Sequence, residues 1–422
     1  MTATLAGSAA ILKTIYAKGC PQEIIKRNNG FILLEKKGDF YGQDFKLPVQ
    51  TETTQGGSAT YTDAAAALAQ SIYYNFLVTR IRDYSLASIT GEALEAANGD
   101  EGSMVSLWKN EMDSAFTAAT RQAAIMMYRS GSGQRGRLTS TSNPATNTIS
   151  IRQEFSVDVA GGGDIQNFAQ GMSVQGTASA NENGALLNAG AVEIIAGINI
   201  ASGTLTSTSA AWTTVIAALA VSDYLSRRGD GINNTGIPKV LTGFKGWLPG
   251  GAAPGTLFGL NRTTSATALA GTNYNATTVP YDIALIEGIY RLKELGGGPD
   301  TGIMHPRMLG NLMKVLDTKS RYPRTTKIGT GQVAFEAVEF ATEDGGVKII
   351  PDMNCQMYTC WLFEEANAYF KAIGSIPKIF DFDNNKFLRE QASDAYTVRC
   401  GMYGQFIVEK PKFGAQISNY GN

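Results

Sequence analysis

The fold is decided by the stretch Asp394-Ala-Tyr-Thr-Val-Arg-Cys-Gly-Met-Tyr-Gly-Gln-Phe-Ile-Val-Glu-Lys-Pro-Lys-Phe-Gly-Ala-Gln-Ile417. From Tyr396 to Val408 it is rich in β-branched and aromatic residues, which favour strands. Pro411 then fits poorly in a central strand, because proline cannot donate a hydrogen bond to a sheet. A strand-and-turn pattern from Trp361 to Phe370 precedes it. The stretch therefore predicts a long closing strand that returns to a sheet begun far upstream.

The strongest helical pattern lies at residues 103–129. Apolar residues recur there at intervals of three and four, which is typical of an amphipathic helix. They are Met104, Leu107, Trp108, Met112, Ala115, Phe116, Ala119, Ala123, Met126 and Met127. Such a helix would be about 40 Å long at 1.5 Å per residue, which is long for a globular protein. Gly131-Ser-Gly-Gln-Arg-Gly136 follows and predicts the turn that ends it.

Residues 39–90 offer little core of their own. Two strands are predicted, at Phe45–Val49 and Phe76–Tyr84, with polar and alanine-rich residues between them. An excursion of this length is unusual inside a compact domain. It is better explained as a flap that lies on a neighbouring subunit.

The middle of the chain predicts two further regions. Residues 148–159 alternate as a strand does, and short strands with frequent turns from Ile165 to Tyr224 predict a small barrel or sandwich. The segment 237–280 is rich in Gly, Pro and Thr, with Trp247 and Phe258 as expected anchors. Helices are predicted at Val279–Leu295 and His305–Lys319, and a hairpin at Phe335–Ile350 that turns at residues 344–346.

The composition is low in charge. Charged residues make up 17% of the chain, against about 25% in an average globular domain. Because charge is depleted from the centres of interfaces, this favours a surface that is covered by other copies or partners. The alternative is a polar β-rich protein with long loops. The net charge of −1 argues against tight nucleic-acid binding.

The cysteines and apolar segments give no sign of export or membrane insertion. Cys20, Cys355, Cys360 and Cys400 form no C-x-x-C motif, so they are expected to be buried thiols in a reducing compartment, although their disulfide state stays open. No secretory signal is evident. The longest nearly apolar run, Ala210–Val221, is too short to span a bilayer. The chain is expected to be soluble, with no membrane partner.

Candidate catalytic groups are few, and each has an ordinary structural explanation. Residues 131–136 match G-x-G-x-x-G, but the glycines end a helix, whereas a dinucleotide site requires that they begin one. His305 is the only histidine, and its place before a helix predicts a turn. The acidic pairs Glu364/Glu365, Glu343/Asp344 and Asp381/Asp383 are expected to be surface carboxylates. The sequence Asp381–Lys386 lacks the Gly and Glu of a calcium loop. No enzyme activity, metal or cofactor is expected.

One basic cluster stands out. Its members are Lys314, Lys319, Arg321, Arg324 and Lys327. These side chains could contact phosphate. A solvated loop and a salt-bridged contact between subunits are equally good explanations.

Taken in order, these patterns resemble the tailed-bacteriophage major capsid proteins, the Hong Kong 97 coat fold family. The resemblance covers nearly the whole chain and rests on its layout and on the pattern from Asp394 to Ile417. It implies an α+β fold with an N-terminal arm, an extended β loop, a long spine helix, peripheral and axial domains, and an inserted β-rich domain. The implied bounds are 1–38 for the arm, 39–90 for the extended loop, 91–160 and 371–422 for the peripheral domain with its spine helix at 103–129, 161–236 for the inserted β-barrel-like domain, and 237–370 for the axial domain.

The resemblance also implies a function and partners. The chain would assemble into hexamers and pentamers of an icosahedral shell around double-stranded DNA, in a virion built in the host cytoplasm. A separate scaffolding protein and a portal are expected, and a decoration protein is an open question. Contacts between subunits are expected from the arm and the loop, at Ile11, Ile15, Phe45, Leu47, Val49, Phe76, Val78, Arg80 and Arg82. One family member cross-links a loop Lys to an Asn; residues 47–79 contain no Lys here, so no such bond is expected from the loop tip.

Two other functions stay open. An encapsulin-like cellular shell would share the fold, although encapsulin chains are usually shorter and lack such an insertion. A β-rich enzyme would need a nucleophile and a base that the sequence does not provide.

Overall fold

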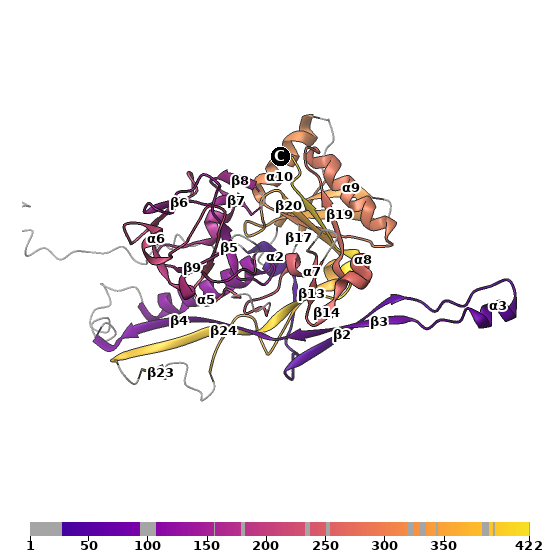
Figure 1. Cartoon of the computed structure of the whole chain (residues 1–422), viewed down its shortest axis with the longest axis horizontal. Coiled ribbons are helices and arrows are strands. Elements are labelled where there is room, and N and C mark those ends of the chain that lie inside the picture. The colour runs from indigo at the N-terminus through magenta and orange to yellow at the C-terminus, as the bar shows by residue number, and fades with distance from the viewer. Residues whose placement is uncertain are drawn as a thin grey trace, which may run out of the picture. The chain divides into compact units, whose positions relative to one another are not determined.

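The computed structural model describes residues 28–92, 107–155, 157–178, 182–232, 237–249, 254–318, 324–328, 335–342, 345–381, 388–390 and 393–421. The chain divides into two compact units. The described residues within 83–121 and 377–402 form unit 1, and those within 28–82, 122–376 and 403–421 form unit 2. The helices and strands are labelled in Figure 1.

Unit 1 is a helix on a narrow sheet. Its elements, some of which continue into unit 2, are β4 (Ile81–Thr90), α5 (Leu107–Met126), β22 (Lys378–Ile379), β23 (Leu388–Arg389) and β24 (Ala395–Val408). β24 pairs with β4, β22 and β23. The small residues Ala87, Ala115, Val398 and Cys400 form the core between helix and sheet. Met112 and Ala115 of α5 face this core, and their spacing of three residues places them on one side of the helix.

The closing strand β24 confirms the long strand predicted from Tyr396 to Val408. Gly401 lets β4 approach it closely, because a Cβ at this position would lie 2.0 Å from the Asp83 carbonyl oxygen. The helix α5 confirms the long helix predicted at 103–129, but it ends at Met126. Residues 101–106 lie outside the described residues.

Unit 2 contains a seven-stranded sheet in the order β15-β25-β20-β16-β19-β18-β17. The elements of this region are β15 (Thr272–Asn275), α9 (Tyr281–Glu294), β16 (Thr301–Met304), α10 (Pro306–Thr318), β17 (Arg324–Ile328), β18 (Phe335–Thr342), β19 (Gly345–Pro351), β20 (Thr359–Phe363) and β25 (Ala415–Ser418). Leu285, Ile289, Met308 and Leu312 pack from the two helices into its main core. The predicted helices and the 335–350 hairpin are therefore confirmed. β25 pairs with β15 and β20, so residues 415–418 extend this sheet.

A second sheet of unit 2 has six strands in the order β5-β12-β9-β10-β11-β6. The elements around it are β5 (Gln134–Arg137), β6 (Thr148–Ser150), β7 (Arg152–Glu154), β8 (Val157–Ala160), η1 (Gly163–Asn167), β9 (Ser173–Thr177), η2 (Leu187–Gly190), β10 (Glu193–Asn199), β11 (Thr204–Ser207), α6 (Trp212–Val215) and β12 (Tyr224–Arg227). Ile149, Val174, Leu205, Trp212 and Leu225 share its core. These strands form the β-rich region that the sequence predicts.

One strand assignment was wrong. We expected residues 148–159 in the peripheral sheet, but β6 pairs with β11 in the six-stranded sheet, and β7 pairs with β8 as a hairpin. The alternation of Ile149 and Ile151 marks one buried face. This alternation does not determine which sheet buries that face. Because β5 and β6 both belong to the six-stranded sheet, the β-rich region also includes residues 134–160.

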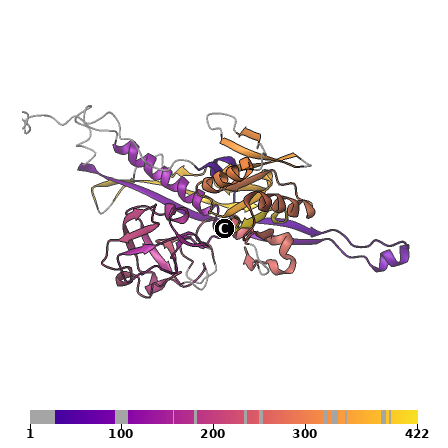
Figure 2. The same cartoon turned by 90° about the horizontal axis from the view of Figure 1, so that it is seen from above.

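The third part of unit 2 is a two-stranded ribbon, β2 (Asp44–Glu52) and β3 (Ile72–Thr79), with α3 (Tyr61–Ala66) in the connection. The ribbon runs outward from the sheets of unit 2 and carries α3 at its tip (Figures 1 and 2). The strand predicted at 76–84 is two strands. The first strand, β3, ends before Arg80. The second, β4, begins after it and pairs with β24.

Short elements complete unit 2. They are α2 (Asn29–Leu33), β1 (Glu35–Lys37), α7 (Phe244–Trp247), β13 (Thr256–Leu257), β14 (Leu260–Asn261), η3 (Arg262–Ser265), α8 (Ala266–Ala270), η4 (Glu365–Asn367), β21 (Ala368–Ala372) and η5 (Pro411–Phe413). β21 pairs with β1 and with the second half of β24. α2, β1 and β21 therefore lie together, next to residue 28, where the described chain begins.

Candidate functional site

The β2–β3 ribbon has two faces of different character. Leu47 pairs with Phe76 and Val49 with Tyr74 on the inner face, where Leu47 and Phe76 are buried. Lys46 pairs with Leu77 and Gln50 with Tyr73 on the outer face, where Tyr73 is 60% exposed. The alternation follows from the two-residue period of a strand. The inner face is fixed by the subunit itself, and the outer face is available to other molecules.

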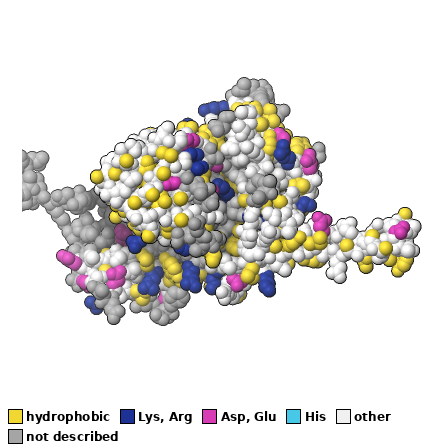
Figure 3. Space-filling view, in the orientation of Figure 1, with side chains coloured by type: hydrophobic (Ala, Val, Ile, Leu, Met, Phe, Trp, Pro, Cys, Tyr) yellow, Lys and Arg dark blue, Asp and Glu magenta, His cyan; other side chains and the backbone are white. Residues whose placement is uncertain are grey.

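The tip of the ribbon exposes apolar side chains that its own subunit does not cover. Tyr61 is 89% exposed and Leu68 is 75% exposed. Gln55 and Ala69 exchange two backbone hydrogen bonds across the connection, and the Thr60 hydroxyl caps α3. Figure 3 shows the apolar side chains gathered at the tip. The only charges between Leu47 and Thr79 are Glu52 and Asp63, so the outer ribbon is apolar and weakly acidic.

The root of the ribbon is held by polar and aromatic contacts. The Lys371 ammonium lies 3.0 Å from Asp39 Oδ2 and 4.2 Å from the centre of the Phe45 ring. The hydrogen bond from Lys371 holds the pKa of Asp39 below its usual value. Arg80 donates a hydrogen bond of 2.7 Å to the Gly42 carbonyl. These contacts order the start of β2 and the end of β3, so the root is part of the folded subunit.

The structure changes the set of expected contact residues. Phe76 and Val78 are fully buried within the subunit, so they are not free to contact a neighbour. Phe45, Leu47 and Val49 lie on the same inner face, and only Arg82 of the two arginines is exposed. Ile11 and Ile15 lie outside the described residues. Sequence reasoning missed Tyr61, Leu68 and Tyr73, because the sequence pattern of an apolar side chain does not show whether its own subunit covers it.

The predicted basic cluster is not brought together as a site by the described residues. Lys314 is exposed on α10, and Arg324 and Lys327 lie on β17, whose side chains are not described. Lys319 and Arg321 lie outside the described residues. The cluster therefore stays a prediction.

The only histidine serves as a helix cap. His305 is buried immediately before α10, and its Nδ1 accepts a hydrogen bond of 3.2 Å from the Arg307 backbone N–H. Burial lowers the pKa of His305 to about 4. The imidazole is therefore neutral near pH 7, and the hydrogen bond accepted by Nδ1 fits the predicted turn role.

The thiols and glycines also have structural roles. Cys355, Cys360 and Cys400 are free and buried, and burial raises the pKa of the Cys355 and Cys360 thiols. Such thiols are poor nucleophiles. Gly131 and Gly133 take φ values of +90° and +81° between α5 and β5, so the G-x-G-x-x-G match is a turn into a strand. Cys20 lies outside the described residues.

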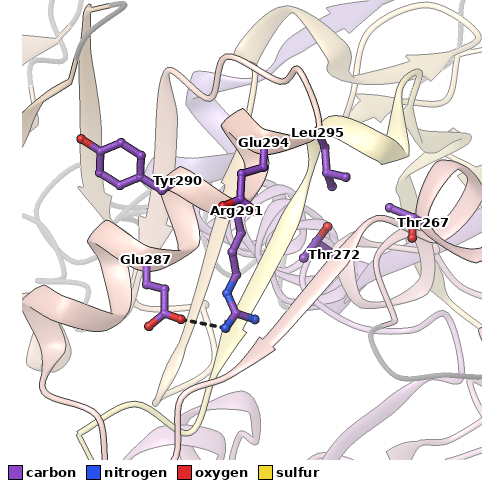
Figure 4. Close-up of a pocket in the computed structure, with 7 residues that line it drawn as sticks. All are labelled: Thr267, Thr272, Glu287, Tyr290, Arg291, Glu294 and Leu295. Carbon is purple, nitrogen blue, oxygen red and sulfur yellow. Dashed lines mark hydrogen bonds and ion pairs between the residues drawn. The ribbon is translucent and has the colours of Figure 1, made fainter.

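A surface hollow beside α9 is lined by three charged side chains, Glu287, Arg291 and Glu294. It is about 520 Å³ and is lined by Thr267, Thr272, Glu287, Tyr290, Arg291, Glu294 and Leu295. Arg291 pairs with Glu287 at 2.7 Å, one turn away on the same helix (Figure 4). The Tyr274 hydroxyl donates to the same carboxylate and holds the pKa of Glu287 below its usual value. The charges satisfy one another, which is the pattern of a surface ion pair.

No group of three or more His, Cys, Asp or Glu side chains among the described residues is placed to hold a metal ion. No helix in that part of the chain is long and apolar enough to cross a membrane.

No protein-family model matches this chain. No curated protein matches it either. Among solved structures, the cyanophage A-1(L) capsid asymmetric unit is similar over 100% of both chains, with a TM-score of 0.59 and 8% identity. The capsid of an empty GTA particle matches with a TM-score of 0.49 and 10% identity, over 100% of this chain and 99% of that chain. The SrpI encapsulin complex of Synechococcus elongatus matches with a TM-score of 0.46 and 9% identity, over 100% and 96%.

Proposed function

We propose that this chain, which has the fold of a phage capsid protein along its whole length, is the major coat protein of a tailed bacteriophage. It assembles into hexamers and pentamers, and these form an icosahedral shell around double-stranded DNA. The observation that carries the proposal is the full-length likeness to the cyanophage capsid chain. At 8% identity that likeness establishes the fold, and the function rests on the fold together with the surface of the ribbon.

The ribbon supports this function because it has the surface of an interface. Tyr61, Leu68 and Tyr73 are exposed at its tip and on its outer face. Exposed apolar groups on an extended element mark a contact site for another molecule. In a shell, the ribbon of each copy lies on the next copy around the ring, so every copy gives one contact and receives one. Such head-to-tail contacts close into rings when the rotation between copies permits it.

The free edge of β2 limits how the ribbon makes that contact. Among the described strands β2 pairs only with β3, so its other edge is not paired by any of them. Pro48 lies in the middle of that strand, and proline protects an edge against unwanted strand addition. We infer that the ribbon contacts its neighbour mainly through side chains.

The remaining partners follow from the same function. The shell protects double-stranded DNA without reading its sequence, in keeping with the net charge of −1. A portal and a separate scaffolding protein take part in assembly in the host cytoplasm, and the mature protein resides in the virion. The coat has a structural role, with no catalytic step.

The test is to express the chain with the genes that neighbour it and to examine the product by size-exclusion chromatography and negative-stain electron microscopy. Closed polyhedral particles of megadalton mass are expected. Nuclease-resistant double-stranded DNA inside them would support a phage coat. Particles that hold only a protein cargo would instead identify a cellular compartment shell. A uniform 45 kDa monomer under all conditions would contradict both.

A further inference from the structure

A small aromatic cluster supports the inner face of the ribbon. Trp247, at the end of α7, is fully buried, and its ring meets the Phe76 ring edge-on at 5.2 Å. Phe258 packs on Trp247 at 5.5 Å. The indole N–H donates a hydrogen bond of 3.0 Å to the Phe406 carbonyl in β24. Trp247 therefore connects the ribbon to the body of unit 2.

The hairpin of β13 and β14 also holds the edge of β3. The Leu77 N–H donates a hydrogen bond of 3.1 Å to the Phe258 carbonyl. Phe258 has a φ of +47°, which is uncommon for a non-glycine residue and directs its carbonyl at β3. Because amides alternate along a strand, those of Phe76 and Val78 point the other way, toward β2. Hydrogen exchange at the Leu77 amide therefore measures the hydrogen bond to the Phe258 carbonyl and not the pairing with β2.

Arg262 organises the irregular backbone behind that support. Its side chain is 3% exposed and donates four hydrogen bonds, all to backbone carbonyls. They go to Gly246 at 2.9 Å, Trp247 at 3.1 Å, Pro254 at 2.6 Å and Gly255 at 3.4 Å. Burial lowers the pKa of Arg262 to about 10, so the group stays charged at neutral pH.

This arrangement requires a guanidinium. The carbonyls of Gly246 and Trp247 end α7 and have no partner within that helix. Those of Pro254 and Gly255 lie in a loop, and buried carbonyls of both kinds must find other donors. A planar fork with five N–H groups can reach several carbonyls at once, whereas an ammonium acts as a compact point charge. An aliphatic residue would leave all four carbonyls without this donor. Arg262 therefore links α7, which contains Trp247, to the loop that leads to Phe258.

We propose that Arg262 is the positioning residue that fixes the direction of the β2–β3 ribbon, through Trp247 and the Phe258 carbonyl. The effect of Arg262 on shell assembly rests on the proposed function. A ribbon with a fixed direction gives every copy the same contact geometry. A ribbon that swings at its root would still find neighbours, but at variable angles. Shells of uniform size would then be replaced by mixed sizes and open sheets.

The test compares Arg262→Lys and Arg262→Gln with the unchanged chain. Hydrogen exchange with single-amide resolution should show faster exchange at Leu77 by roughly tenfold or more, with little change at Phe76 and Val78. The matched control is Arg135→Lys, since Arg135 is also buried and donates 2.7 Å to a backbone carbonyl, that of Asn167, in the six-stranded-sheet region. This control should leave Leu77 protected. Unchanged protection of Leu77 in both Arg262 variants would overturn the proposal.

Particle size distributions give the second readout. The Arg262 variants should form particles of mixed size, while Arg135→Lys particles should keep the size of the unchanged chain. Loss of Leu77 protection with uniform particles would also overturn the proposal, because the ribbon would then not set the geometry. If the unchanged chain forms no particles, the proposed function fails, and the exchange of Leu77 still decides whether Arg262 holds the ribbon. If Arg262→Lys does not fold, Phe258→Gly is the second variant. It keeps the carbonyl and the positive φ but removes the Phe258 ring that packs on Trp247, so hydrogen exchange at Leu77 should become faster.

Discussion

The Tyr128 hydroxyl donates a hydrogen bond of 2.8 Å to Asp352 Oδ2, which joins the segment after α5 to the loop after β19. The same oxygen accepts the Gly30 N–H at 2.6 Å, and Oδ1 accepts the Asn354 N–H at 2.8 Å. A Cβ on residue 30 would lie 2.2 Å from the Tyr128 hydroxyl, so only glycine fits there. One buried carboxylate thus anchors the root of the N-terminal segment to the body of unit 2.

Removing one donor from this anchor should weaken the fold measurably. Tyr128→Phe keeps the ring and deletes the hydroxyl, so we expect the free energy of unfolding to fall by about 1–3 kcal/mol. Chemical denaturation would measure it. Tyr73→Phe is the matched control, because Tyr73 is 60% exposed on the ribbon, and it should change stability little. Equal stability of Tyr128→Phe and the unchanged chain would show that the anchor contributes nothing.

The pH dependence of stability should reveal His305. Its pKa is about 4 in the folded chain because the ring is buried, and its ordinary value is 6.5. Between these values the unfolded chain binds a proton that the folded chain does not, so the free energy of unfolding falls as the pH drops from 6.5 toward 4. The total loss is on the order of 3 kcal/mol, at 1.36 kcal/mol per pKa unit.

His305→Asn isolates this effect. Asn is a favoured helix cap, and its side-chain oxygen can accept the same backbone N–H. Since the chain has no other histidine, the difference in stability between the two proteins should vary with pH across this window and be flat from pH 7 to 8. Denaturation curves at a series of pH values would measure it. Parallel curves from pH 7 down to 4.5 would contradict the burial of a neutral imidazole.

The charge pair of Arg129 and Asp164 should behave as a buried unit. The Arg129 guanidinium lies 2.5 Å from Asp164 Oδ1, and both side chains are nearly inaccessible to solvent. Burial raises the pKa of Asp164 in spite of Arg129. Removing one partner leaves the other charge buried and unpaired, so Arg129→Met should cost about 3–5 kcal/mol. The double variant with Asp164→Leu should recover part of that loss in a double-mutant cycle. Additive losses would show that the two groups do not interact.

The exposed tip of the ribbon should matter for assembly and little for folding. Tyr61→Ser combined with Leu68→Ser removes apolar surface that the subunit leaves exposed, so the melting temperature should be nearly unchanged. The yield of closed particles should fall several-fold, because apolar contacts supply most of the interface energy. Ile200→Ser is the matched control, because it removes an apolar side chain that is 52% exposed after β10, away from the ribbon, and it should leave the particle yield unchanged. Full particle yield from the double variant would remove the tip from the interface.

Much of the layout could be predicted from local sequence. The long strand β24, the helices α9 and α10 and the hairpin of β18 and β19 each carry a strong periodic pattern within one segment. Trp247 and Phe258 were recognised as anchors because large aromatic residues stand out in a Gly-rich segment. Local pattern and final structure agree wherever a single element decides the outcome.

Long-range pairing could not be predicted in the same way. Residues 148–159 alternate as a strand of any sheet would, and the choice of β11 as the partner of β6 depends on residues 204–206. The break between β3 and β4 at Arg80 is marked only by a one-residue shift in the alternation, from buried Phe76 and Val78 to buried Ile81. Arg262 carries no local signal of its role, since its four acceptors are backbone carbonyls, which no side-chain pattern marks.

The most direct test of the account is a cryo-electron microscopy map of assembled particles. The account predicts a closed shell in which the β2–β3 ribbon of each copy lies on the adjacent copy, with Tyr61 and Leu68 covered by it. A shell in which these two side chains face solvent, or a protein that remains a 45 kDa monomer throughout, would contradict it.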